Sequence, residues 1–331
     1  TWKAKEYTGT YGTNGFYLPM TPTTQATGFN TVLYAGAGAT QSINGVGFSP
    51  DLVWIKRRNG ANNHNLFDSV RGTNALLSNA INSELNRFFG SYDSDGFSFA
   101  SGGHADNNAS GGTYVAWCWD AGSGSAVSNT TGDINSTVKA NDATGFSIVS
   151  YTGDGSASST VGHGLGSSAS MIIVKDRQVS NHWRVWHKDL SANHWIYLSL
   201  NIGERSAATD GGIRNVDANT FGFINGTTAG VEAVNTNGRD YIAYCFAEVA
   251  GYSKFDSYTG TGSSGKVVTT GFRPAFVMIK RIDADSRNWI IMDSIRDPGS
   301  VIDMPLYANL TNTEVLTTTN TMTPTTTTTP T

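Results

Sequence analysis

The sequence predicts an all-β protein made of tandem antiparallel β-sandwich domains of jelly-roll or concanavalin-like type. The 331 residues include 38 glycines but only 15% charged residues, and long solvated helices need Glu, Lys and Arg on their outer faces. Gly, Ser, Thr, Asn and Asp fill the intervals between short apolar runs, as in turns between strands. One strand pattern also recurs three times at a domain-sized spacing, which indicates tandem domains rather than a solenoid.

The opening strand of each copy carries a Phe near its start and ends in Tyr-x-Gly-x-Gly. The copies span residues 28–38, 145–155 and 254–262. No helix follows whose N-terminus could hold a phosphate, so the motif does not indicate nucleotide binding. We interpret it as a strand that runs into a glycine turn.

A short apolar run that ends in a lysine forms the second strand of each copy. These runs lie within residues 47–56, 171–175 and 271–280. Such a run, entered through a Gly or Pro turn and ended by a cation, is typical of a buried strand that emerges into solvent. The third element of the copies lies at residues 66–71, 183–188 and 289–296.

A glycine-led aromatic strand closes the first two units, at residues 112–119 and 238–246. Its consecutive apolar and aromatic side chains predict burial on both faces and a central position in the sheet. The third unit has no such strand, because Thr-rich sequence follows Val315. This unit is therefore either half a domain or completed by another segment, and residues 7–12 of the leader resemble the opening motif.

These elements predict the domain boundaries. The chain divides into a leader strand segment (1–27), a first repeat (28–122), a linker (123–144), a second repeat (145–251), a partial third repeat (252–315) and a Thr-rich tail (316–331). The tail cannot bury a core and is expected to form an extended stalk or spacer. Residues 74–89 have apolar side chains near helical spacing, which predicts one short helix or a long loop.

The two cysteines occupy the same position in two copies of the closing strand. Cys118 and Cys245 each lie between bulky aromatic residues. A disulfide needs Cα atoms within about 7 Å, and equivalent positions of separate domains seldom meet this condition. We expect two buried free thiols that act as small hydrophobic side chains.

Tryptophan and histidine cluster in the second unit, and the glycan-contact candidates among them are Trp183, Trp186, His187 and Trp195. Aromatic faces stack on sugars, and imidazole groups bind hydroxyls. A metal site is disfavoured because the histidine spacings match no ligand pattern. The interpretation favoured most is that Trp183 and Trp195 pack in the core, since large aromatic residues usually fill cores.

Catalytic and cofactor motifs are missing from the sequence: it has no nucleophile elbow, phosphate loop or zinc-protease helix, and no cofactor is expected. Glycosidase carboxylates are defined by a separation of roughly 5–9.5 Å in space, so a glycan-degrading enzyme stays an alternative. A net charge of −4 without a basic block disfavours nucleic acid as a partner. No apolar run approaches the length of a membrane span.

The repeated residues resemble a repeat of virion structural and tail-fibre-like proteins of marine tailed phages, particularly those of cyanobacteria. The shared segments are residues 28–38, 47–57, 65–72, 95–97 and 114–119. Residues 6–18 are similar to the end of a lectin-like module that often precedes these repeats. This family has no established activity to transfer to any residue.

The resemblance implies a non-enzymatic virion component, namely a fibre, tail or head-decoration protein on the particle surface. Its expected partners are other virion proteins, copies of itself with a trimer favoured, and host surface glycans. Two alternatives remain at this point. One is a tail-spike enzyme that degrades polysaccharide, and the other is a self-assembling extracellular filament whose third unit is completed by strand addition.

Overall fold

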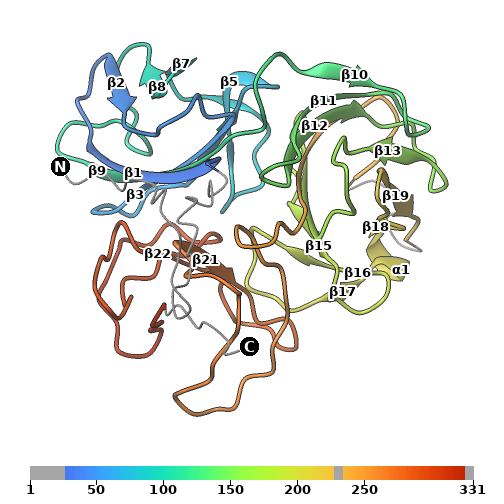
Figure 1. Ribbon diagram of the computed structural model, residues 1–331. Coiled ribbons are helices and arrows are strands. Elements are labelled where there is room, and N and C mark those ends of the chain that lie inside the picture. The colour runs from blue at the N-terminus through green and yellow to red at the C-terminus, as the bar shows by residue number, and fades with distance from the viewer. Residues whose placement is uncertain (1–26, 227–233, 325–331) are drawn as a thin grey trace, which may run out of the picture.

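The computed structural model describes residues 27–226 and 234–324. The regular secondary structure of these residues is almost entirely antiparallel β-strand, which confirms the predicted all-β fold class. Figure 1 shows three lobes around a common centre, coloured blue to cyan, green to yellow, and orange to red. The lobes correspond to the three sequence units.

The first unit is a sandwich of a six-stranded and a three-stranded sheet. Its strands are β1 (Phe29–Ala35), β2 (Gln41–Asn44), β3 (Leu52–Arg57), β4 (Asn65–Asp68), β5 (Gly72–Leu77), β6 (Leu85–Asn86), β7 (Phe89–Asp93), β8 (Gly96–Phe99) and β9 (Thr113–Trp119). The larger sheet has the order β1-β9-β3-β4-β5-β6, and the smaller one has the order β2-β8-β7.

The second unit repeats this plan with an eight-stranded and a three-stranded sheet. Its elements are β10 (Val127–Asn129), β11 (Ser136–Asn141), β12 (Phe146–Thr152), β13 (Thr160–Gly162), β14 (Met171–Asp176), β15 (Arg184–His187), β16 (His194–Tyr197), β17 (Arg205–Ser206), α1 (Ala207–Asp210), β18 (Gly212–Arg214), β19 (Thr220–Ile224) and β20 (Asp240–Phe246). The sheet orders are β10-β11-β12-β20-β14-β15-β16-β17 and β13-β19-β18.

The third unit is a hairpin of β21 (Phe276–Ile279) and β22 (Ile290–Asp293). Two backbone hydrogen bonds between Ile291 and Leu306 extend it by one bridge, with N···O distances of 2.7 and 3.0 Å. Within the described residues, this unit has neither the small outer sheet nor a closing strand.

The closing strands are central, as predicted. β9 pairs with β1 and β3, and β20 pairs with β12 and β14. Trp117 of β9 lies opposite Thr31 on one side and Trp54 on the other. Five consecutive residues of each closing strand are buried, so both faces of these strands pack against other elements.

Alternate side chains of each large sheet enter two different cores. In β9, Ala116 and Cys118 face the core inside the first sandwich, whereas Val115 and Trp117 enter a core that all three units share. The second sandwich does the same with its own interior core. The shared core also contains Trp289 of the third unit. Each large sheet is therefore covered by its small sheet on one face and by the neighbouring units on the other.

The Tyr-x-Gly motif has a packing cause in the first two units. Tyr34 stacks on Tyr114 of β9 with 5.1 Å between ring centroids, and Tyr151 stacks on Tyr241 of β20 at 5.2 Å. A Cβ atom at Gly36 would lie 2.3 Å from a backbone carbonyl oxygen. At Gly153, two residues after Tyr151, a Cβ atom would lie 2.4 Å from a backbone carbonyl oxygen. Both glycines therefore allow the chain to pass close to the loop before the closing strand.

Three expectations need correction. Residues 123–144 are not a linker, because they contain β10 and β11, which add to the second sheet. β11 is polar and buries only alternate side chains such as Val138, so its sequence resembles a loop.

Residues 74–89 contain strands instead of a helix. In the Thr-rich tail, Met322 pairs with Ile302, so the described part folds back rather than forming a stalk. The leader motif at residues 7–12 lies outside the described residues.

Candidate functional site

The structure separates the four residues expected to contact glycans. Trp183 and Trp195 are 0% and 1% exposed, and the Trp183 indole donates a hydrogen bond to the Leu77 carbonyl at 2.8 Å. Neither ring can therefore stack on a sugar at the surface. Their burial favours the core interpretation, and the expectation that they contact a glycan is wrong.

Trp186 and His187 lie at the end of β15 and are half-buried. Trp186 packs against the core of the second sandwich, and the His187 ring lies 6.4 Å from the ring of Phe255. Burial lowers the pKa of His187, an effect that nearby Asp189 opposes. Of these two residues, only His187 therefore faces the third unit.

The two cysteines are buried and free, as expected. Each lies in the interior core of its own sandwich. Burial raises the pKa of the Cys245 thiol to about 12 and that of Cys118 further, so both are unreactive near neutral pH. Within the described residues, no group of three or more His, Cys, Asp or Glu side chains could hold a metal ion.

The ionisable residues of the interior gather instead at the junctions between units. At each junction a glutamate donates its backbone N–H to the second residue after the lysine of the next unit. The three hydrogen bonds run from Glu84 to Arg177 (3.1 Å), from Glu204 to Ile282 (2.8 Å) and from Glu314 to Arg58 (2.9 Å). The third bond returns to the first unit, so the three units close into a ring.

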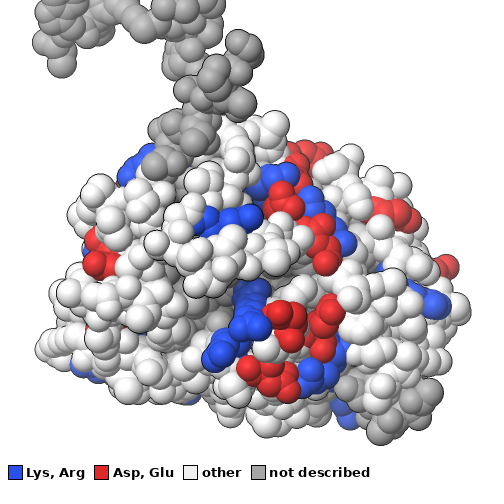
Figure 2. Space-filling view, turned by 90° about the horizontal axis from the view of Figure 1, so that it is seen from below, with Lys and Arg blue, Asp and Glu red and all other residues white. Residues whose placement is uncertain are grey.

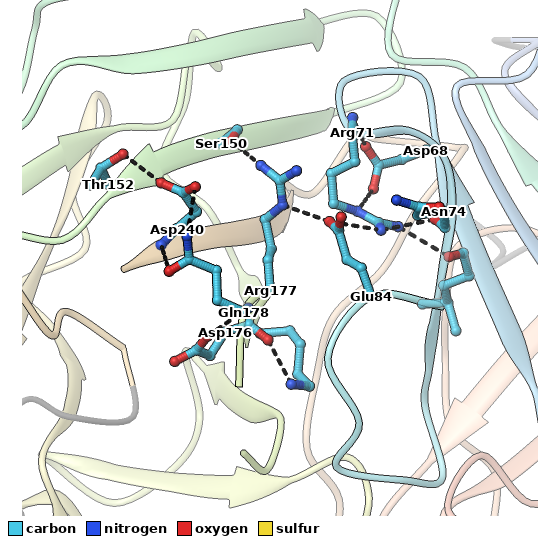
Figure 3. A network of polar contacts seen from close by, with 12 residues as sticks. Asp68, Arg71, Asn74, Glu84, Ser150, Thr152, Asp176, Arg177, Gln178 and Asp240 are labelled. Atoms are coloured by element: carbon cyan, nitrogen blue, oxygen red, sulfur yellow. Dashed lines mark hydrogen bonds and ion pairs between the residues drawn. The ribbon is translucent and has the colours of Figure 1, made fainter. Parts of the chain in front are cut away.

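Figure 3 shows the junction between the first and second units. The Glu84 carboxylate binds Arg71 of its own unit and Arg177 of the second unit, at 3.4 and 2.6 Å. Partial burial alone would raise the pKa of Glu84, but the hydrogen bond from Arg177 and the charge of Arg71 hold it below its ordinary value. Arg71 also pairs with Asp68, and both side chains are fully buried. The Tyr244 hydroxyl of β20 donates to the same Asp68 carboxylate at 2.8 Å.

The junction between the third and first units repeats this arrangement. Glu314 binds Arg296 of its own unit at 2.8 Å and Arg58 of the first unit at 2.7 Å. Arg296 pairs with fully buried Asp293, which accepts a 2.9 Å hydrogen bond from the Trp117 indole of β9. In both junctions, a closing-strand aromatic residue thus donates to a buried aspartate of the neighbouring unit.

The junction between the second and third units differs. His187 and Leu190 occupy the positions that Asp68 and Arg71 have in the first unit. The Glu204 carboxylate instead accepts two hydrogen bonds from Ser191, one from its backbone N–H at 3.1 Å and one from its hydroxyl at 2.8 Å. This is the junction at which the third unit would present its closing strand.

The lysines that end the second strands are expected to be exposed, but the structure buries them. Lys56 and Lys175 are fully buried, and Lys280 is half-buried. Each ammonium donates to two backbone carbonyls of the following loop, and Lys56 also donates to the Thr311 carbonyl of the third unit at 3.2 Å. Burial lowers the pKa of each of the three lysines to about 8, against the opposing effect of nearby carboxylates. The lysines hold the loops that accept the glutamate N–H groups.

A polar cleft of about 550 Å³ lies beside β10 and β11. Its lining includes Ser125, Ser128, Thr130 and Lys139. Figure 2 shows basic and acidic side chains next to each other in one part of the face seen from below, with uncharged residues over most of the rest. Exposed pairs such as Arg281–Asp283, with 2.6 Å between nitrogen and oxygen, mix the two signs in the same way.

Comparison with family models matches residues 25–325 to one family, described as a domain of unknown function, DUF7483. The match covers all three units of the ring. The chain belongs to the DUF7483 family. No curated protein and no solved structure matches the chain. The third unit of this DUF7483 chain, with its open closing-strand position, lies inside the matched range.

The glutamate ring of this DUF7483 chain could have been found from the sequence. The chain has only six glutamates, and Glu84, Glu204 and Glu314 follow the third element of the three units at similar distances. A rare residue type that recurs with a repeat indicates a repeated contact. In the part of the chain that the structure describes, no helix is long and apolar enough to cross a bilayer.

Proposed function

We propose that the protein is a non-catalytic structural component of a phage virion, either a fibre, a tail or a head-decoration protein. Its loops would be displayed on the particle surface, and its partners would be other virion proteins and two further copies of itself. The resemblance of the repeats to virion proteins supports this proposal. The observation that carries it is the closed ring, in which the buried ionisable residues of two junctions bind one another.

The ring favours a structural role because it leaves its interior charges satisfied. Asp68 binds Arg71 and Tyr244, and Glu84 binds two arginines. Catalytic groups, in contrast, are held where a substrate can reach them, often with a strongly perturbed pKa. The perturbed lysines of this protein bind backbone carbonyls instead of facing a cleft.

Purified phage particles test this proposal. We expect quantitative mass spectrometry to find the protein at a fixed number of copies per particle, and gold-labelled antibodies to bind intact particles. Absence from purified particles, or labelling only of lysed host cells, would contradict the proposal. If the protein instead forms long filaments by itself at increasing concentration, the filament alternative replaces it.

A second proposed role is binding of host surface glycans at the cleft beside β10 and β11. Hydroxyl groups and an ammonium line this cleft, and such groups hydrogen-bond to sugar hydroxyls. Trp186 offers a separate, half-buried aromatic surface. The two sites predict different effects of mutation.

A glycan array with the purified protein distinguishes the two sites. Thr130→Arg, at an exposed position, would fill the cleft and abolish binding there, whereas Trp186→Ala would abolish binding at the end of β15. If neither substitution abolishes the signal, both proposed sites are contradicted. Release of new reducing ends from host polysaccharide by the unmodified protein would favour the degrading enzyme over a binding protein.

A further inference from the structure

The third unit leaves open the position that a closing strand fills in the other two. β9 lies between β1 and β3, and β20 lies between β12 and β14. β21 is the equivalent of β3 and β14, yet within the described residues its only paired strand is β22. Among the residues that the structure describes, nothing pairs with the other edge of β21, and such an edge has the geometry that accepts an added strand.

Burial along β21 differs from that of its equivalents. Trp54 of β3 and Ile173 of β14 are each 3% exposed, whereas every residue of β21, including the corresponding Met278, is only half-buried. The side chains of β21 are as apolar as those of the other two strands. An apolar strand that is half-buried on both faces has room for a further neighbour.

The residues that contact a closing strand in the other units are exposed in the third. Tyr258 is the equivalent of Tyr34 and Tyr151, which stack on the first tyrosine of β9 and of β20. Its side chain is 48% exposed. Gly260, two residues later, has nothing within 4 Å of the position of a Cβ atom, unlike Gly36.

The outer face of the third unit is uncovered in the same way. Val267 lies four residues before the Gly-Phe turn, as Ile43 does in the first unit. Ile43 is 5% exposed, but Val267 is 68% exposed and the adjacent Val268 is 44% exposed. In the part of the chain that the structure describes, no second sheet covers these valines, whereas Ile43 lies in the core between the two sheets of the first unit.

We infer that the open edge of β21 binds an antiparallel strand of a partner polypeptide with the chemistry of a closing strand. Such a strand carries a glycine at its start, then a tyrosine to stack on Tyr258, then alternating aliphatic and aromatic residues. Because His187 and Leu190 replace the aspartate and arginine of the other junctions, the core-facing residue meets no buried carboxylate. An apolar or aromatic side chain fits there against Leu190 and Met278.

The described part of a second copy does not supply this strand. β9 and β20 are each paired on both edges, so a copy could donate either strand only by opening its own sandwich. The proposal does not depend on the virion role, since it rests on the strand edge alone.

A synthetic peptide with the sequence of residues 238–247, with Ser in place of Cys245 and a fluorescent label, serves as the probe. We expect its fluorescence anisotropy to rise on titration with the full chain. Hydrogen exchange of the β21 amides should slow at least tenfold, with no change in β3 or β14. A control peptide with Tyr241→Asp and Ile242→Asp should not bind.

The Tyr258→Ala variant supplies a second measurement in a protein that stays folded, because this side chain is exposed. Loss of one aromatic pair should weaken peptide binding about threefold to tenfold, while Val127→Ala, at an exposed position outside the third unit, should leave it unchanged. Absence of binding, or protection only at β3 or β14, would overturn the inference. Protection of β21 that depends on protein concentration without peptide would assign the edge to a second copy.

Discussion

The fully buried Asp68–Arg71 and Asp293–Arg296 pairs are the residues on which two of the three junctions depend. Removing two charges from water costs several kcal/mol per ion, so a buried pair persists only where other hydrogen bonds satisfy it. Arg71 donates to the carbonyl oxygens of Leu66 and Asn74 in addition to Asp68. The aromatic donor from the neighbouring closing strand satisfies the carboxylate, so each pair is stable only when two units are in place.

Substitution of Arg71 tests this dependence. Arg71→Leu leaves Asp68 as an unpaired buried charge, and we expect it to lower the free energy of unfolding by about 3–5 kcal/mol. The measurement is urea denaturation followed by tryptophan fluorescence. Arg281→Leu, which breaks the exposed pair with Asp283, is the matched control and should cost below about 1 kcal/mol.

A double variant separates charge from packing. Asp68→His with Arg71→Leu copies the residues that the second unit has at these positions, and we expect it to be more stable than Arg71→Leu alone. Equal stability of the single and double variants would show that the loss comes from packing and not from the unpaired carboxylate.

At the scale of the strands, β11 shows how a short polar segment becomes part of a sheet. It pairs with β12 over its whole length, from Ser136 opposite Tyr151 to Asn141 opposite Phe146. Val138 and nearby Ile134 enter the core of the second sandwich at 4% and 7% exposure. The segment between the first two units is therefore an edge of the second unit, and Lys139 joins it to Asp51 of the first unit at 2.6 Å.

Truncation of Val138 checks this assignment. If 123–144 were a linker, Val138→Ala would have no effect, whereas burial in a core predicts a loss of about 1–3 kcal/mol in the free energy of unfolding. Val127→Ala in β10, where the side chain is 63% exposed, should change stability by less than about 0.5 kcal/mol. Thermal unfolding followed by circular dichroism measures both.

The sequence allows some of these strands to be predicted and hides others. A run such as Tyr114 to Trp119 specifies a central strand, because only burial on both faces accommodates it. The same run does not indicate that the second face of the strand packs against two other units, because a hydrophobic pattern predicts burial but not the packing partner. β11 could not be recognised because polar residues surround its one buried valine, and the buried lysines could not because lysine is usually exposed.

On the scale of the whole molecule, three lysines with a pKa of about 8 lie at equivalent places in the ring. Each holds a loop that accepts a hydrogen bond from a neighbouring unit. Several buried tyrosines, among them Tyr151 and Tyr244, have a pKa raised well above 10, chiefly by burial. The two groups give the stability of the ring opposite pH dependences.

We therefore expect the free energy of unfolding to rise between about pH 8 and pH 10 and to fall above that. In the lower range the unfolded lysines, with a pKa near 10.5, bind protons that the folded ones have lost, so stability rises with pH. Above pH 10 the unfolded tyrosines lose protons that the folded ones keep, which reverses the slope. Urea denaturation across this range measures the curve.

The Lys56→Met variant serves as the control for this curve, and its slope between pH 8 and 10 should be shallower than that of the unmodified protein, whatever its absolute stability. A steady fall in stability from pH 8 upward would contradict the assignment of a lowered pKa to the buried lysines.

The hydrogen bond that the Arg58 guanidinium donates to the Glu314 carboxylate joins residues 256 positions apart in the chain. Closure of so long a loop carries a large entropic cost before any contact compensates for it. Strand pairing inside each sandwich is far more local, so the sandwiches can form while this contact is still absent. We therefore expect the hairpin of β21 and β22 to join the first unit in the last step of folding. In such an intermediate the hydrogen bond from the Trp117 indole to Asp293 would be absent, and a protease would cut the third unit before the two sandwiches.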